Sequence, residues 1–375
     1  MNKKIKIAHV LHAVGGVDVY LKLVTENIDP DRFENVIVYQ QDGSKKKYVD
    51  RNGKSLKEYK IPVQREINVF KDCVAVIRTV KILKKEKPHI IHAHSAKGGI
   101  IARAASLFYK VNVLHTPHAY SFLSAESRFL KRLYLFIEKV FKNFNSILLA
   151  TSESERRRGI DEVKYSEERA LRFDNSIFPI DNTRDVNVIE LPDKYLCTVS
   201  RPSYQKNVEM MVWVVHELKR KIPDIHLVIM GVGEYSPNKE NIIQLIENLE
   251  LTDNVTLIKW MERDKILSVI KKSLLYISTS RYEGLPYSVI ESLALSKACV
   301  VTDCDGNKDL IVHEFNGFLT DVEDVKGMVK SIERLYFDDQ LRKQFEKNAF
   351  TLFNEKLNME KNISELEKIY TDLSL

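Results

Sequence analysis

Short apolar runs alternate with longer amphipathic stretches along almost the whole chain. In the first half the apolar runs are residues 5–13, 35–41, 89–95, 111–119 and 146–152. The second half repeats this rhythm with runs at 195–201, 226–231, 254–260, 274–280 and 298–303. Apolar strands that are separated by helices predict parallel sheets with helices on both faces.

The extent of this pattern predicts two domains. A chain of 375 residues is longer than a single hydrophobic core usually serves. The polar stretch Thr183–Asp193 is the best candidate for a linker. We therefore predict an α/β protein with two doubly wound domains facing across a cleft, residues 1–185 and 186–355. Residues 322–375 are helical in pattern, which predicts a helical tail whose last part, 356–375, packs back on the first domain.

The composition is that of an ordinary soluble protein, with 44% apolar and 29% charged residues. No apolar run approaches the ~20 residues that span a bilayer. The basic N-terminus leads into an apolar segment too short for a signal peptide, so we interpret it as a first strand. Four cysteines without a CxxC pair argue against a metal or disulfide framework and favour a reducing cytoplasm.

Charge is unevenly distributed. Residues 1–190 contain 34 Lys/Arg and 23 Asp/Glu, a net charge of +11. The remaining residues contain 24 Lys/Arg and 29 Asp/Glu, a net charge of −5. Residues 51–150 alone contain 19 Lys/Arg and 6 Asp/Glu, a net charge of +13. Such a block indicates an anionic partner, which could be nucleic acid, anionic lipid or a phosphorylated substrate; a solvated basic face is an equal alternative.

The most informative segment is RYEGLPYSVIE, residues 281–291, between an apolar strand and a helix. It places Glu283 and Glu291 eight positions apart, across a Gly-Leu-Pro turn. Two carboxylates, backbone N–H groups and a helix start thus meet at one strand end, where ligands of open α/β sheets bind. This combination suits a polyhydroxylated, negatively charged ligand, with acceptors for hydroxyls and donors for phosphate.

Three further loops follow predicted strands. The segment 200–207 carries Arg201 and Lys206, whose charges suit a diphosphate and could replace a metal; two solvated cations are the alternative. Gly15-Gly16 after the first strand would let the backbone approach a phosphate or sugar, or form a structural turn. Gly231 would keep a binding surface free of side chains, although a simple turn explains it equally well.

Histidines are concentrated in the first half of the chain, at His89, His92, His94, His115 and His118. Alternating positions in an apolar strand favour packed histidines over metal ligands. His118 differs, because Thr116-Pro117-His118 ends a strand and its imidazole could contact a sugar hydroxyl or a developing charge.

Residues 126–144 predict an amphipathic helix. Its apolar stripe consists of Phe129, Leu133, Phe136, Ile137, Val140 and Phe144, and Arg128, Lys131, Arg132, Lys139 and Lys142 lie mostly off it. We favour a crossover helix that packs this stripe on the sheet. The basic face could still lie against anionic headgroups.

The segment SRYEGLPYSVIESLALSKACVVTD, continued by Gly306, Asp309 and Asn316-Gly317, closely resembles the signature of retaining glycosyltransferases of family 4. That family has the GT-B fold of two Rossmann-like domains. The resemblance covers nearly the whole chain, because Gly15-Gly16, His118, Thr151–Ser154 and the Arg201/Lys206 pair occur in the expected order. The segment His92–Gly99 is most similar to transferases that build bacterial surface polysaccharides.

The resemblance implies a role for each matching position. The 1–185 domain would bind the acceptor and the 186–355 domain the nucleotide sugar. Arg201 and Lys206 would hold the donor diphosphate in place of a metal, so no metal and no cofactor is expected. Together with Glu283 and His118, which would act on the transferred sugar, they are the predicted catalytic residues, and Glu291 would accept from the ribose. The residues implied to bind the donor are Gly15, Gly16, Arg201, Lys206, Gly231, Met261, Glu283, Gly284, Leu285, Pro286 and Glu291.

Two positions depart from the family pattern. Trp260-Met261-Glu262 stands where members often have glycine, which leaves the identity of the base open. Asn175–Phe178 matches the usual Asn-Gly-(Val/Ile)-Asp element poorly, which blurs the interdomain hinge.

The function implied is a metal-independent retaining transfer of a hexose or N-acetylhexosamine from a nucleotide diphosphate sugar, UDP-sugar favoured. The acceptor would be a lipid-linked oligosaccharide of bacterial O-antigen or capsule synthesis. We expect reaction on one face of the sugar, with the leaving phosphate helping to deprotonate the acceptor. The +13 block motivates the hypothesis of a cytoplasmic protein that lies against the anionic inner face of the cytoplasmic membrane.

Other interpretations use the same residues differently. A GT-B epimerase would act on a nucleotide sugar without an acceptor, and a non-catalytic partner would bind the nucleotide sugar alone. A nucleic-acid-binding protein would explain the basic block but not the Glu283–Glu291 segment, so we predict no nucleic-acid partner.

Overall fold

The computed structural model describes residues 4–12, 15–40, 47–63, 68–125, 127–180, 190–233 and 236–374. By its internal contacts the chain divides into two compact units. The first comprises Met1–Asn175 with Glu360–Leu375, and the second comprises Ser176–Met359. The predicted boundary between residues 185 and 186 and most of the predicted linker Thr183–Asp193 lie outside the described residues.

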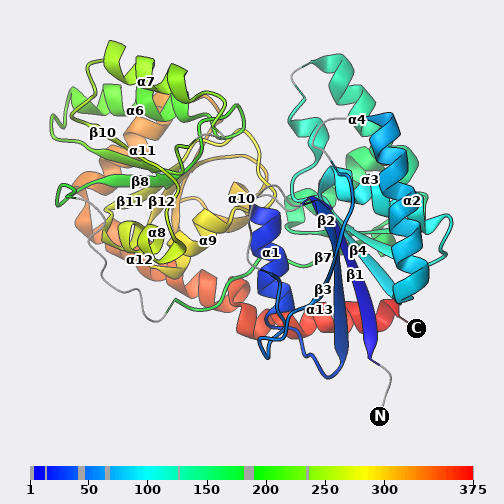
Figure 1. The fold of residues 1–375 in the computed structure, drawn as a ribbon. Helices are drawn as coiled ribbons and strands as arrows, with labels where there is room; N and C mark the ends of the chain where they lie inside the picture. The colour runs from blue at the N-terminus through cyan, green and yellow to red at the C-terminus, as the bar shows by residue number, and fades with distance from the viewer. Residues whose placement is uncertain are drawn as a thin grey trace. The chain divides into compact units, whose positions relative to one another are not determined.

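The first unit contains a sheet of seven parallel strands in the order β3-β2-β1-β4-β5-β6-β7. The strands are β1 (Ile5–His12), β2 (Phe33–Gln40), β3 (Lys57–Lys60), β4 (Ile90–His94), β5 (Asn112–Thr116), β6 (Ser146–Ala150) and β7 (Ala170–Arg172). The helices are α1 (Gly16–Thr25), α2 (Val69–Glu86), α3 (Ser95–Ser106), α4 (Arg128–Phe141) and α5 (Glu153–Arg158), with short helical turns at η1 (Ser121–Leu123), η2 (Gly159–Val163) and η3 (Glu167–Arg169). All five strands predicted in this half are present, and Figure 1 labels β1, β2 and β4 among them.

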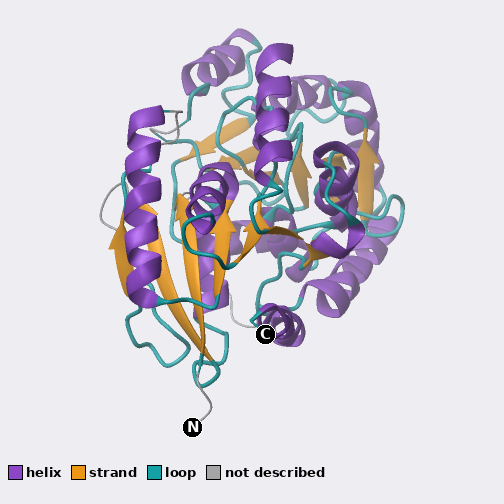
Figure 2. Ribbon diagram, turned by 90° about the vertical axis from the view of Figure 1, so that its right-hand side faces the viewer, coloured by secondary structure: helices purple, strands orange, loops and turns teal. Residues whose placement is uncertain are grey.

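The second unit contains a sheet of six parallel strands in the order β10-β9-β8-β11-β12-β13. These are β8 (Leu196–Val199), β9 (Leu227–Met230), β10 (Val255–Ile258), β11 (Leu275–Ser278), β12 (Cys299–Thr302) and β13 (Gly317–Thr320). The helices are α6 (Val208–Lys219), α7 (Lys239–Asn248), α8 (Arg263–Lys272), α9 (Tyr287–Ala294), α10 (Asn307–Leu310), α11 (Val325–Phe337) and α12 (Asp339–Leu352), followed by η4 (Phe353–Leu357) and α13 (Met359–Leu373). The predicted two doubly wound domains and helical C-terminal end are therefore confirmed, with helices beside the strands in Figure 2.

The two faces of the first sheet differ in chemistry because neighbouring side chains of a strand point to opposite faces. Ala8 and Val10 of β1 belong to an apolar core together with residues of α2 and α3. His9, between them, points to the other face, where the ring of Tyr20 from α1 contacts His92 and His94. The α2/α3 face of this sheet is thus mainly an apolar core, and the other face carries the buried His9, His92 and His94 beside a smaller apolar cluster with α1.

Helix α13 closes the histidine-lined face from the far end of the chain. Its Tyr370 hydroxyl lies 2.6 Å from His92 Nδ1. Glu367 accepts hydrogen bonds from the backbone N–H of Asp29 at 2.9 Å and from Arg32 Nη1 at 2.8 Å. These contacts place the end of the chain within the first unit (Figure 1).

Helix α4 does not pack as predicted. Phe129, Leu133 and Phe136 of the expected buried stripe are 74%, 37% and 62% exposed. The helix instead turns Tyr134 and Leu135 toward the cluster around η1 and η2, and its Glu138 forms a buried ion pair with Arg103 of α3 at 2.9 Å. The hydrogen-bonded carboxylate determines which face turns inward, because a buried guanidinium without a partner would be costly.

Helix α3 lies unusually close to the first sheet because two glycines of the His92–Gly99 segment face it. A Cβ atom on Gly98 would lie 2.6 Å from the carbonyl oxygen of Val10, and one on Gly99 would lie 2.4 Å from His115 Nε2. In the part of the chain that the structure describes, no helix is both long and apolar enough to cross a membrane.

Candidate functional site

The strongest candidate site of the second unit lies where β8 and β11 end. These neighbouring strands form the point at which strand order reverses, because β8 pairs with β9 on one side and β11 on the other. Open α/β sheets bind ligands at such a point, beyond the carboxyl ends of the strands. The loop after β8 carries Arg201 and Lys206, and the loop after β11 carries Glu283.

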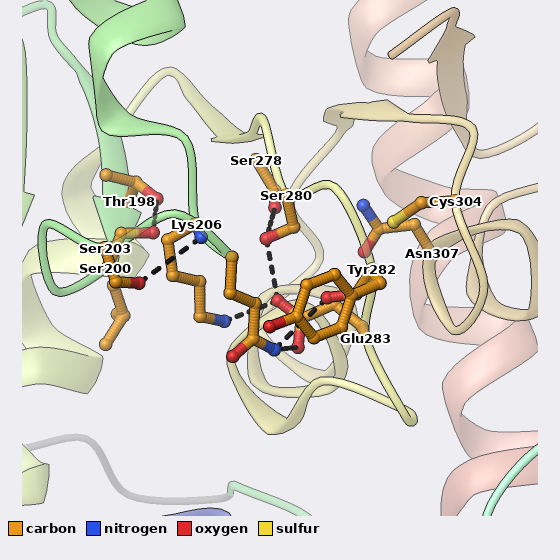
Figure 3. A network of polar contacts seen from close by, with 12 residues as sticks. Thr198, Ser200, Ser203, Lys206, Ser278, Ser280, Tyr282, Glu283, Cys304 and Asn307 are labelled. Atoms are coloured by element: carbon orange, nitrogen blue, oxygen red, sulfur yellow. Dashed lines mark hydrogen bonds and ion pairs between the residues drawn. The ribbon is translucent and has the colours of Figure 1, made fainter. Parts of the chain in front are cut away.

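Lys206 and Glu283 form an ion pair at this strand edge. Lys206 Nζ lies 2.6 Å from Glu283 Oε1, and their side chains are 21% and 7% exposed (Figure 3). Ser280 Oγ donates to the same carboxylate oxygen at 2.7 Å. Gln205 Nε2 donates to Glu283 Oε2 and to the backbone carbonyl of Tyr282, both at 3.1 Å. The carboxylate is therefore held in a defined orientation beside a cation.

A second set of contacts joins the same two loops. The guanidinium of Arg281 lies over the ring of Tyr204 at 4.4 Å, and its Nη1 donates to the Tyr204 backbone carbonyl at 2.6 Å. The Thr279 hydroxyl donates to the backbone carbonyl of Asn207 at 2.8 Å. The loops that carry Lys206 and Glu283 are therefore held together independently of the Lys206–Glu283 pair itself.

The Gly284–Pro286 turn connects Glu283 to helix α9. Its backbone lies close to the loop after β12, because Glu283 N–H donates to the Asp305 carbonyl at 3.2 Å. Gly306 has a φ of +80°, and a Cβ there would lie 2.7 Å from the Gly284 oxygen. Pro286 caps α9, whose N-terminal end offers positive potential to an anion.

Glu291 is held by a different cation. It is buried in α9, and its Oε1 lies 2.8 Å from Arg263 Nε at the start of α8. Burial raises the pKa of the Glu291 carboxyl, and Arg263 opposes that rise. The two carboxylates of the predicted segment thus have separate cationic partners, Lys206 and Arg263.

The remaining predicted donor residues lie at loops of the same unit. Arg201 is exposed in the loop after β8. Gly231 follows β9 with a φ of +101°, a conformation that favours glycine. Met261 lies just before α8, next to Trp260, which is 73% exposed.

Three predicted residues lie in the first unit. Gly15, with a φ of +60°, precedes α1, and Gly16 is its first residue. His118 follows β5, and its Nε2 lies 3.3 Å from His94 Nδ1. Burial lowers the pKa of His118 to about 3, so this imidazole is neutral near pH 7.

Behind His118 lies a cluster of buried histidines. The potential ligand atoms of His9, His92 and His94 lie within 4.8 Å of one another. All six ring nitrogens are nevertheless engaged, since His9 bonds Asn35 and His94, His94 also bonds His118, and His92 bonds Tyr370 and Thr116. Burial also lowers the pKa of each ring. The arrangement fits a hydrogen-bond network better than a metal centre.

Comparison with known families covers almost the whole chain in two parts. A family model described as Glycosyltransferase Family 4 matches residues 14–175. A second, described as Glycosyl transferases group 1, matches residues 179–352. The fold agrees with a solved structure of Anabaena Alr3699/HepE in complex with UDP, with a TM-score of 0.81 at 16% identity over 99% of this chain and 100% of that one. The chain is a glycosyltransferase with the GT-B fold.

Two relatives extend along most of this glycosyltransferase. An Escherichia coli protein named UDP-Gal:alpha-D-GlcNAc-diphosphoundecaprenol alpha-1,3-galactosyltransferase is 26% identical, covering 99% of this chain and 98% of its own. The capsular polysaccharide biosynthesis glycosyltransferase CapM of Staphylococcus aureus is 24% identical, with 86% and 88% covered.

Several residues of these networks were not identified from sequence, and four of them show why. Gln205 and Ser280 orient Glu283, Arg263 pairs with Glu291, and His9 joins the histidine cluster. Gln205 stands directly beside Lys206, which is a usable signal. His9 and Arg263 gave no such signal, because their partners His94 and Glu291 are 85 and 28 residues away in the sequence.

Proposed function

We propose that this glycosyltransferase transfers a hexose or N-acetylhexosamine, with retention of anomeric configuration, from a UDP-sugar to a lipid-linked oligosaccharide of surface-polysaccharide synthesis. The observation that carries the proposal is the Lys206–Glu283 pair beyond the carboxyl ends of the neighbouring strands β8 and β11. It combines a cation for a diphosphate with an oriented acceptor for sugar hydroxyls. The UDP complex of the structural neighbour and the names of the two relatives support the choice of substrates.

Different residues of the second unit would bind different parts of the donor. Lys206 and Arg201 would neutralise the diphosphate, and Glu283 would accept hydrogen bonds from sugar hydroxyls. Because Ser280 and Gln205 already orient Glu283, its carboxylate needs no rearrangement when Lys206 turns to the diphosphate. Glu291 would accept from the ribose, and the backbone of Gly231, Met261 and Gly284–Pro286 would contact base, phosphate and sugar.

The chemistry asked of these groups is mainly electrostatic. The bond between the anomeric carbon and the diphosphate oxygen breaks, and its electron pair leaves with the diphosphate. The acceptor oxygen forms the new bond on the same face of the ring, and its proton passes to a leaving phosphate oxygen. Lys206 and Arg201 stabilise the negative charge that grows on the diphosphate. Such electrostatic stabilisation of the transition state is usually the largest single contribution to catalysis.

Helix α4 would bring the enzyme to its lipid-linked acceptor. Its exposed Phe129, Leu133 and Phe136 alternate with Arg128, Lys131 and Arg132, and residues 127–137 contain no acidic side chain. Exposed aromatic groups among cations suit the headgroup boundary of an anionic bilayer. We therefore propose that the enzyme binds the inner surface of the cytoplasmic membrane as a peripheral protein.

The transfer is tested with purified protein, a panel of UDP- and GDP-sugars, and a saccharide linked to a lipid diphosphate. We expect product with one UDP-sugar, without added metal, and with the donor's anomeric configuration by NMR. Conversion of the donor to a different nucleotide sugar in the absence of any acceptor would instead identify an epimerase. Binding of nucleotide sugars with neither transfer nor hydrolysis would identify a non-catalytic binder.

Membrane docking is tested by liposome flotation. We expect the protein to float with anionic vesicles and to stay behind with neutral ones. Replacing both Phe129 and Phe136 by serine should abolish flotation. The matched control replaces Phe337 and Phe350, which are exposed on helices of the second unit. Equal flotation of both double variants would contradict docking through α4.

A further inference from the structure

A line of hydrogen bonds runs across the first sheet to His118. We propose that Asn35, His9 and His94 are positioning residues that select the tautomer of His118, so that its Nδ1 accepts a hydrogen bond from a substrate hydroxyl. This inference deepens the proposed function and rests on it for the identity of the hydroxyl, which belongs to a sugar.

The four residues lie in order on neighbouring strands. Asn35 is in β2, His9 in β1, His94 at the end of β4, and His118 just after β5. The distance from Asn35 Oδ1 to His9 Nε2 is 3.1 Å, and that from His9 Nδ1 to His94 Nε2 is also 3.1 Å. His94 Nδ1 lies 3.3 Å from His118 Nε2. The line is continuous from the core to the strand edge.

The direction of every hydrogen bond follows from the first. An amide oxygen can only accept, so His9 Nε2 must carry the proton. A neutral imidazole has one donor and one acceptor, so His9 Nδ1 accepts from His94 Nε2. The same rule then makes His94 Nδ1 the acceptor for His118 Nε2. The lone pair of His118 is therefore left on Nδ1.

The rule requires neutral rings, and their surroundings provide them. His9 and His94 are completely buried, and His118 is partly exposed. Burial lowers the pKa of His9 to about 4 and that of His118 to about 3, and lowers the pKa of His94 well below its usual value. Among the described residues, His118 Nδ1 has no hydrogen-bond partner.

Neighbouring groups hold the rings in place. His92 packs against His94 with ring centroids 4.1 Å apart, and both of its nitrogens are occupied by Tyr370 and Thr116. Tyr20 packs edge-on against His118 at 5.0 Å. His118 itself has a φ of +52°, and the next residue, Ala119, donates its N–H to Glu155 Oε1 at 2.7 Å. A left-handed backbone that is anchored in this way indicates a position selected for where its side chain points.

The lone pair determines which substrate group His118 can bind. A neutral Nδ1 accepts from an O–H group and offers no positive charge to a phosphate. His118 would therefore bind a sugar hydroxyl, whereas the diphosphate is left to the cations of the second unit.

The tautomer can be measured without any substrate, by long-range ¹H–¹⁵N NMR of the histidine rings near pH 7. In the wild type we expect His118 to show a protonated Nε2 and an unprotonated Nδ1. His226 provides an internal reference of opposite type, because its Nδ1 lies 3.1 Å from the carbonyl oxygen of Asp253 and must donate. A wild-type His118 with its proton on Nδ1 would overturn the proposal outright.

Variants of Asn35 test whether this line of hydrogen bonds, the relay, determines the tautomer of His118. Asn35→Leu removes the acceptor that starts the line, so His118 should become a mixture of tautomers while His226 is unchanged. Its kcat should fall about fivefold with little change in KM, the ratio that one net hydrogen bond gives. Asn35→Gln keeps an uncharged amide oxygen as acceptor and should retain the wild-type tautomer and rate. An unchanged His118 spectrum in a folded Asn35→Leu protein would refute the relay.

The two readouts separate the hypotheses. If Asn35→Leu does not fold, the wild-type spectrum and Asn35→Gln still decide the tautomer. If no transferase activity is found with any donor, the proposed function fails, yet the NMR result stands. A tautomer shift in Asn35→Leu with an unchanged kcat would show that the relay exists but does not serve the reaction.

Discussion

The two sheets share one strand order but carry different chemistry at the same topological position. Reading outward from the central strand, β1 and β4 in the first sheet correspond to β8 and β11 in the second. The first pair itself contains buried neutral histidines, His9 in β1 and His94 in β4, which are linked to one another and to His118. Next to the second lie the ion pairs Lys206–Glu283 and Arg263–Glu291. Topology determines where a site forms, and side chains determine whether it recognises hydroxyls or charge.

The difference has an energetic origin. A buried ring without a counter-ion is cheaper to keep neutral, which is why burial lowers the pKa of His9, His92 and His94. Lys206 at the strand edge has a carboxylate partner instead, because its Nζ lies 2.6 Å from Glu283 Oε1. The first site is therefore uncharged near pH 7, and the second is ionic.

The largest expected difference between the two units is in how acid changes their stability. Unfolded histidines take up protons below their ordinary pKa of 6.5, whereas His9, His92 and His94 take them up only at lower pH. The free energy of unfolding is thus fully retained above pH 6.5 and falls as the pH drops toward about 4. Each ring contributes a slope of about 1.4 kcal/mol per pH unit.

Urea unfolding between pH 7.5 and 4.5 measures this effect. Circular dichroism follows both units, and fluorescence follows the second, because Trp213 and Trp260 both lie there. We expect the circular dichroism midpoint to drop before the fluorescence midpoint. A stability that is constant from pH 7 to 5 would show that the buried rings are not neutral in the folded protein.

Replacing Lys206 tests the ionic site. Lys206→Ala should lower kcat by a factor on the order of 10²–10³, the usual cost of removing one preorganised group that stabilises developing negative charge. Lys221→Ala is the control, because Lys221 pairs with Glu333 at 2.9 Å but is 66% exposed on the surface. Near-normal turnover of Lys206→Ala in a purified transferase assay would remove Lys206 from the proposed site.

Replacing His118 should have a smaller effect. His118→Leu removes one hydrogen-bond acceptor for a hydroxyl, which predicts a fall of about tenfold in kcat/KM. His118→Gln, which keeps an acceptor, should lose less, and His216→Leu on α6 serves as the control. A deoxy sugar that lacks the contacted hydroxyl should be used equally well by wild type and His118→Leu. If His118→Leu lost as much activity as Lys206→Ala, the proposed difference between a hydroxyl-binding site and an ionic site would be wrong.

Sequence patterns predicted most strands but missed those with weak signals. β3 has the sequence KEYK, and its residues are intermediate or exposed, so it lacks the apolar run on which prediction depends. β13, with the sequence GFLT, is short and starts with glycine. The edge strand β3 is little buried, whereas β13 is mostly buried but only four residues long, and hydrophobic periodicity reports neither well.

The orientation of α4 shows a second limit. Periodicity identified the helix, yet Phe129, Leu133 and Phe136 face outward because a different side holds Glu138 against Arg103. A helix with apolar residues on more than one side has no unique inward face from sequence alone. The ion pair that decides between them joins residues 35 positions apart.

What the sequence determined by itself is local: the alternation of strands and helices, the two-domain organisation, and the loops that carry Arg201, Lys206, Glu283 and Glu291. What only the tertiary structure decided is pairing between distant segments, such as Lys206 with Glu283 and His9 with His94. The physical reason is that periodicity and turn chemistry act over a few residues. Partners for buried polar groups are supplied by strand order, which brings residues 77 and 85 positions apart into hydrogen-bond contact.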